Sequence, residues 1–145
     1  NASQTSTKKP YNNKLAAKAR SLIKYGDIYL KQANYQLAKD YYQKAFKIAD
    51  ENDLDNIKIE YFISKAKLHH ALNQRSVALI NYSNAVPIAE ELKTHDAMTE
   101  IYSNSAYIYY ELSDNQTAKN YLTKALQIAK KQRQKNMLAE FYFNF

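Results

Sequence analysis

The chain has 145 residues, 46% of them hydrophobic, and a formal net charge of +7. One glycine, two prolines and no cysteine exclude disulfides, thiol chemistry and a glycine-rich phosphate-binding loop. With few chain breakers and 14 tyrosines, the composition predicts an all-α domain with a continuous core. The sequence has no run of 18 apolar residues, so we predict no membrane span in it.

In chain order, residues 1–13 are polar, include Pro10, and are predicted to be a disordered lead-in or a remnant of cloning or processing. Residues 14–145 are predicted to form one domain. Apolar spacing predicts helices near 14 to 32, 35 to 51, 55 to 72, 75 to 92, 96 to 112, 115 to 133 and 136 to 145. Pro87, inside the fourth of these, is expected on an outer face where water serves the free carbonyl of Ser83.

Three copies of a 40-residue unit run through these helices, at about 17–56, 57–96 and 97–136, with a partial fourth at 137–145. Small residues recur in register where two helices of a unit are expected to pack closely. They are Gly26, Ala66 and Ala106 in the first helices, and Ala38, Ala45, Ala78, Ala85, Ala118 and Ala125 in the second. A repeat of this period indicates a stacked array, which is usually a binding surface and seldom an enzyme.

The pattern resembles the tetratricopeptide repeat (TPR), which places a bulky residue, a small residue and a ring on one helix, then Ala, an aromatic and Ala on the next. The first unit fits best, with Leu22, Tyr25, Gly26, Tyr29, Ala38, Tyr42 and Ala45. The proline usual near the end of the second helix is replaced by Asp50, Glu90 and Lys130. The resemblance implies a right-handed α-α superhelix, a TPR solenoid of three helical hairpins plus a partial fourth first helix. It also implies a non-catalytic module that binds protein or peptide.

The resemblance further implies that the first helices line a concave groove. The side chains expected to face it are Lys24, Asp27, Leu30, Lys67, His70, Asn104, Tyr107 and Tyr110. Such amides, cations and rings suit an extended peptide or a partner helix, although a merely solvated face carries a similar mixture. The family's chaperone-tail clamp is disfavoured, because Ile23 and Asp27 stand where its first polar residues belong.

Other classes of function have weaker support in the sequence. Basic residues do not follow one face through all three units, which disfavours nucleic acid and leaves an acidic protein partner compatible with the charge. His69 and His70 are adjacent on a helix and point about 100 degrees apart, so they cannot readily share a metal ion. No nucleophile motif appears. We therefore expect no enzymatic activity, no cofactor and no metal in this chain.

Two functional hypotheses follow. The long repeat looks like those of bacterial signalling proteins, which favours a sensory or regulatory module of a histidine kinase or diguanylate cyclase. The alternative is a free-standing interaction scaffold. Self-association through the array ends is a further expectation, because a partial repeat leaves apolar surface uncovered. The sequence ends within a fourth first helix, for which we expect continuation. It leaves open whether this bacterial chain is cytoplasmic or the extracytoplasmic part of a membrane-anchored sensor.

Overall fold

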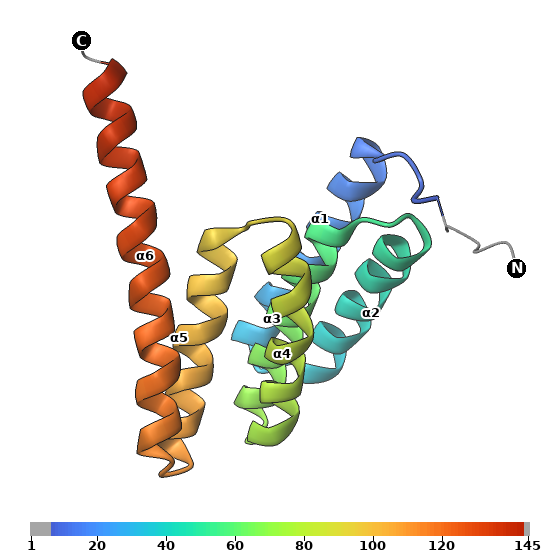
Figure 1. Ribbon diagram of the computed structural model, residues 1–145. Coiled ribbons are helices and arrows are strands. Elements are labelled where there is room, and N and C mark those ends of the chain that lie inside the picture. The colour runs from blue at the N-terminus through green and yellow to red at the C-terminus, as the bar shows by residue number, and fades with distance from the viewer. Residues whose placement is uncertain (1–6, 144–145) are drawn as a thin grey trace, which may run out of the picture.

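The computed structural model describes the backbone of residues 7–143 and the side chains of residues 7–136. All regular secondary structure in this range is α-helical, as the sequence predicts (Figure 1). The helices are α1 (Asn13–Lys31), α2 (Tyr35–Glu51), α3 (Asp55–Ala71), α4 (Arg75–Glu91), α5 (His95–Glu111) and α6 (Asn115–Phe143). In this range no helix is long and apolar enough to cross a membrane.

The five turns between the helices share one geometry, which explains the length of the repeat. Each contains a non-glycine residue with positive φ, at positions 33, 53, 73, 93 and 113. In the first turn the amide of Ala33 donates to the carbonyl of Leu30 at 3.0 Å, and that of Asn34 donates to Tyr29 at 2.9 Å. These two bonds define a Schellman cap. Helices of 17 residues, as in α2 to α5, followed by such turns give half-units of 20 residues and hence the 40-residue period.

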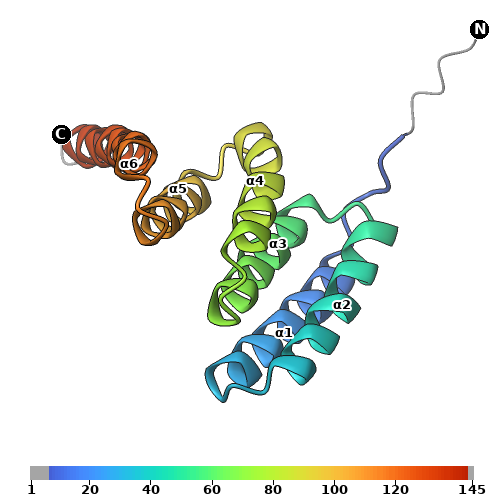
Figure 2. The same ribbon diagram turned by 90° about the horizontal axis from the view of Figure 1, so that it is seen from below.

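Consecutive helices form antiparallel hairpins, α1/α2, α3/α4 and α5/α6, which stack in chain order (Figures 1 and 2). Between hairpins, α2 packs on α3 and α4 packs on α5. The first helix α1 also packs directly on α3, whereas α3 and α5 approach each other much less. The two junctions between hairpins are therefore not equivalent.

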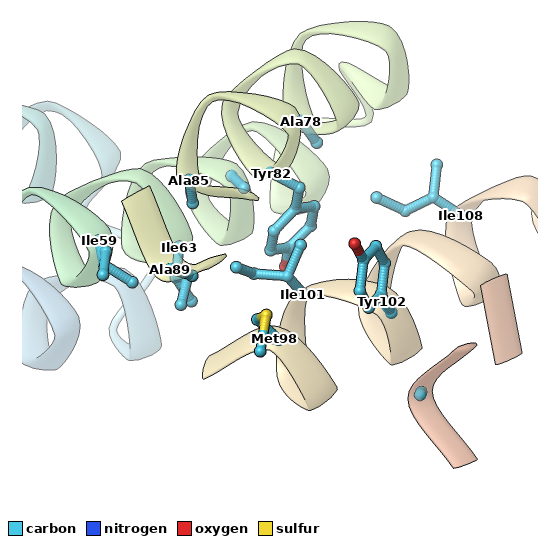
Figure 3. Close-up of a cluster of buried hydrophobic side chains, with 12 residues drawn as sticks. Ile59, Ile63, Ala78, Tyr82, Ala85, Ala89, Met98, Ile101, Tyr102 and Ile108 are labelled. Carbon is cyan, nitrogen blue, oxygen red and sulfur yellow. The ribbon is translucent and has the colours of Figure 1, made fainter. Parts of the chain in front are cut away.

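Small residues lie where the hairpins close and stack. Gly26, Ala38, Ala45, Ala66, Ala78, Ala85, Ala106 and Ala125 are all buried, while Ala118 is only partly buried. One core cluster surrounds Tyr42 between α1, α2 and α3. The other surrounds Tyr82, whose ring lies between α4 and Ile101 of α5 (Figure 3). The register of small residues read from the sequence thus coincides with the buried interior.

The predicted turn at residues 134 to 136 is wrong, because α6 runs without interruption from Asn115 to Phe143. The separate helix predicted at 136 to 145 is accordingly a continuation of α6 as far as Phe143, and its last two residues lie outside the described range. A regular helix satisfies its own backbone hydrogen bonds, so a turn forms only where capping and packing favour it. Repeat spacing alone did not reveal this.

Two other sequence expectations concern Pro87 and the lead-in. Pro87 is exposed, and α4 continues through it from Arg75 to Glu91, in agreement with the expected outer face. Residues 1–6 lie outside the described range, whereas residues 7–12 lie along the α2–α3 turn. There Lys8 Nζ lies 2.7 Å from Asp55 Oδ2, and the backbone amide of Lys9 donates to Asp53 Oδ2 at 2.9 Å.

Candidate peptide-binding groove

The first helices α1, α3 and α5 carry the residues predicted to face a groove, and these residues differ in accessibility. Lys24 and Lys67 are exposed, and the rings of Tyr107 and Tyr110 keep 58% and 66% of their surface accessible. The partly buried members of the predicted set are Asp27, Leu30, His70 and Asn104. Four exposed side chains, two cationic and two aromatic, are thus available to a ligand.

Two of the partly buried residues hold the helices together. The hydroxyl of Tyr42 on α2 donates to Asp27 Oδ1 on α1 at 2.6 Å. Burial raises the pKa of Tyr42, and the Asp27 carboxylate raises it further. Burial also raises the pKa of Tyr82 to about 12, an effect that a hydrogen bond with Asn104 partly offsets. Asp27 and Asn104 therefore anchor buried tyrosines, a structural use that the sequence reading did not anticipate.

Long polar side chains of α3, and Arg75 at the start of α4, reach across to α5. Lys67 Nζ lies 2.6 Å from Glu100 Oε1. Glu111, at the end of α5, contacts His70 Nε2 and accepts a hydrogen bond from Arg75 at 3.0 Å. The Arg75 guanidinium and His70 lower the pKa of Glu111, against the opposing effect of burial. The ring of His70 also meets Tyr107 edge-on, with centroids 5.9 Å apart.

Sequence reasoning missed Arg75 and Glu111 as members of this network. In the sequence, both residues can be noticed only because they differ from the other repeats. The positions equivalent to Arg75 hold Tyr35 and Asn115, and the positions equivalent to Glu111 hold Lys31 and Ala71. The corresponding bridge between α1 and α3 is Arg20 with Glu60, at 3.2 Å. Each such half-exposed ion pair contributes under about 1 kcal/mol to the free energy of unfolding. These bridges therefore align neighbouring helices along their axes more than they stabilise the fold.

The exposed rings of α5 border a shallow hollow of about 520 Å³. Its apolar lining comes from α5 and α6, and Lys119 lies at its edge. The lining residues are Ser103, Ala106, Tyr107, Tyr110, Asn115, Ala118, Lys119 and Leu122. Rings, aliphatic side chains and a cation in one place can bind an apolar side chain next to a carboxylate.

The described residues contain no group of three or more His, Cys, Asp or Glu side chains that could hold a metal ion. His69 is partly buried and has Nδ1 2.6 Å from Gln74 Oε1. The bridged carboxylates, Glu60, Glu100 and Glu111, each face a cation.

Three stacked hairpins with small residues in their interior define an α-α solenoid of repeats. The tetratricopeptide-repeat family profile matches residues 19–52 and 99–132. The two matches begin two 40-residue periods apart. The chain belongs to the tetratricopeptide-repeat family and is a protein-interaction module, of a fold that is generally non-catalytic. No curated protein matches it.

Proposed function

We propose that the chain binds a protein or peptide segment along its first helices, as the sensory or regulatory part of a larger bacterial signal-transduction protein of the histidine kinase or diguanylate cyclase type. The observation that carries the binding proposal is the exposure of Tyr107 and Tyr110 beside an apolar hollow. Rings left this accessible are costly in water and typical of interaction surfaces. The signalling role is supported by the length of the repeat.

Cationic side chains extend the same surface toward α1. Lys24 is exposed on α1, Lys67 is exposed on α3 although it pairs with Glu100, and the chain as a whole carries a net charge of +7. Cations along a groove favour carboxylates of the ligand, and rings favour its apolar side chains. The proposed ligand is therefore a segment that carries both acidic and apolar residues.

A peptide-array screen tests the binding proposal. The wild type is compared with the double variant Tyr107→Ala, Tyr110→Ala, and Tyr25→Ala serves as the matched control because its ring is 54% exposed on α1. We expect the double variant to lose acidic, apolar-rich peptides that the wild type and the control both retain. Equal capture by all three proteins would refute the groove assignment.

The signalling proposal needs its own test. In the complete protein, mutation of Tyr107 and Tyr110 should change the output of an attached kinase or cyclase without changing the amount of folded protein. If the complete protein has no output domain, the chain is a free-standing scaffold instead.

A further inference from the structure

One face of α6 is largely exposed, whereas the equivalent faces of α2 and α4 are buried or partly buried. Ala49 and Ala89 have no accessible surface, and Tyr42 and Tyr82 are each 1% exposed. At the equivalent positions of α6, Ala129 is exposed and Leu122 keeps 48% of its surface accessible. The α6 face is here defined as Ala118, Leu122, Leu126 and Ala129.

The chain itself shows what fits such a face. The equivalent face of α2 is covered by α3. Ile57, Tyr61 and Leu68 of α3 are at most 3% exposed and belong to the same buried cluster as Tyr42. The ring of Phe46, at the position equivalent to Leu126, lies 4.5 Å from that of Tyr61, centroid to centroid. The occupant of this kind of face is therefore a helix with apolar residues at the spacing of 57, 61 and 68.

Charge distinguishes the α6 face from its two predecessors. At the α2–α3 junction Asp50 Oδ1 pairs with Lys58 Nζ at 3.2 Å. Glu90 occupies the equivalent position in α4, but Lys130 occupies it in α6. Residues 115–136 contain six Lys or Arg and no acidic residue. At the α4–α5 junction Met98 stands where α3 carries Lys58, so the pair is not obligatory, but cations along α6 favour a covering helix with acidic side chains, and an acid at the Lys58 position would lie near Lys130.

The opposite end of the array is built differently. On α1, Ser21 is exposed at the position that Tyr61 and Ile101 hold in α3 and α5, where both are buried. A polar residue there suits a terminal helix that faces water. No comparable polar replacement occurs at Leu122 or Leu126, which are 48% and 62% exposed. The α6 face has kept the character of a stacking surface.

We propose that the α6 face binds an acidic amphipathic helix of a partner protein. Its apolar residues would have the spacing of Ile57, Tyr61 and Leu68, with a carboxylate directly after the first. The α6 face shares Ala118 and Leu122 with the hollow beside Tyr107 and Tyr110, so this proposal rests on the proposed function and specifies a helix as its ligand. A second copy of the chain fits less well, because pairing two α6 faces would bring cations of one copy against cations of the other.

The test uses two labelled peptides that span residues 54–71, one with the natural sequence and one with Lys58→Glu, titrated with the folded chain in fluorescence anisotropy. Replacing a repulsive contact with Lys130 by an attractive one should tighten binding about fivefold. With the Lys130→Asp variant of the chain, the order of the two peptides should reverse. The same affinity for both peptides, or no binding of either below about 100 µM, would overturn the proposal.

Position-matched variants show whether the α6 face is the site. Leu122→Asp should weaken binding of the Lys58→Glu peptide at least about tenfold, because it places a carboxylate in the apolar contact. Thr123→Asp makes the same charge change one position further on α6, where the side chain is exposed, and should change binding little. Equal effects of Leu122→Asp and Thr123→Asp would contradict the assignment.

Sedimentation velocity distinguishes the other occupant. A monomer at high concentration, together with the peptide results above, supports a partner helix. A dimer that Leu122→Asp converts to monomer, while Thr123→Asp does not, would show that a second copy fills the face and would overturn the proposal.

Discussion

Gly26 is the one position in the array where the repeat requires no side chain at all. A Cβ placed there would lie 2.7 Å from Cδ1 of the Tyr42 ring and closer still to Cε1. The ring cannot retreat easily, because it is buried and its hydroxyl donates to Asp27, the residue next to Gly26. In the second unit Ala66 faces Tyr82, but Lys67 stands where Asp27 would hold the ring.

The variant Gly26→Ala therefore combines two opposing effects. Alanine favours the helix by about 1 kcal/mol over glycine, while overpacking a filled interior costs roughly 1–3 kcal/mol. We expect a net loss of about 1 kcal/mol in the free energy of unfolding. Urea denaturation followed by circular dichroism at a helix band measures this loss, with the unfolding slope checked for two-state behaviour.

The matched experiment repeats Gly26→Ala in a Tyr42→Leu background, which copies the natural pair Ala106 and Leu122 of the third unit. Without the ring, the helix propensity of alanine should dominate and the substitution should stabilise by up to about 1 kcal/mol. The two backgrounds should then differ by about 2 kcal/mol. The reasoning fails if Gly26→Ala stabilises the protein equally in both.

Four further predictions concern stability. The pKa of Tyr82 is raised from an ordinary 10.0 to about 12, so the free energy of unfolding should fall as pH rises through this interval, by roughly 2 kcal/mol more in the wild type than in Tyr82→Phe. Urea denaturation at a series of alkaline pH values measures this fall, and the same pH dependence in both proteins would contradict the prediction. The lowered pKa of Glu111, ordinarily 4.5, predicts that its contribution is present above that pH and lost as pH falls through the lower folded value; acid titration of Glu111→Gln should show a smaller loss than the wild type. Leu54→Ala should lower the free energy of unfolding by about 2–5 kcal/mol because Leu54 is fully buried. Leu92→Ala should lower it by under about 1 kcal/mol, because Leu92 is 41% exposed. Similar decreases in melting temperature for the two variants would argue against this. Ala33→Gly should stabilise by about 0.5–1 kcal/mol, because Ala33 has φ of 57°, and a lower melting temperature would refute the strain argument.

The periodicity of the sequence was sufficient to predict the fold of most of the chain. Most of the alanines 40 residues apart lie in the interior because close helix packing admits only small side chains there; Ala118 and Ala129 of the third unit are less buried. The helix ends followed from polar joins, and α2 begins and ends at the predicted residues, Tyr35 and Glu51. The turn predicted at residues 134 to 136 was wrong, because alignment with the earlier units does not show whether the chain leaves the helix there or continues as helix.

The groove was less accessible to sequence reasoning. Asp27 and Lys67, at equivalent positions, were both expected to face the groove, but Asp27 accepts a hydrogen bond from Tyr42 while Lys67 pairs with Glu100. Whether a polar side chain faces solvent or a buried hydroxyl depends on the residue across the hairpin, which a one-dimensional pattern does not specify. Arg75 and Glu111 come together from different units for the same reason.

The unequal junctions between hairpins affect how the array responds to load. Between the first and second hairpins, helix backbone packs on helix backbone from α1 to α3. Between the second and third, contact between the first helices α3 and α5 depends on side-chain pairs such as Lys67 with Glu100, and the lysine side chain has several rotatable bonds and yields at little cost. Bending should concentrate at this second junction, so that α5 and α6 swing as one lever while the first two hairpins keep their curvature.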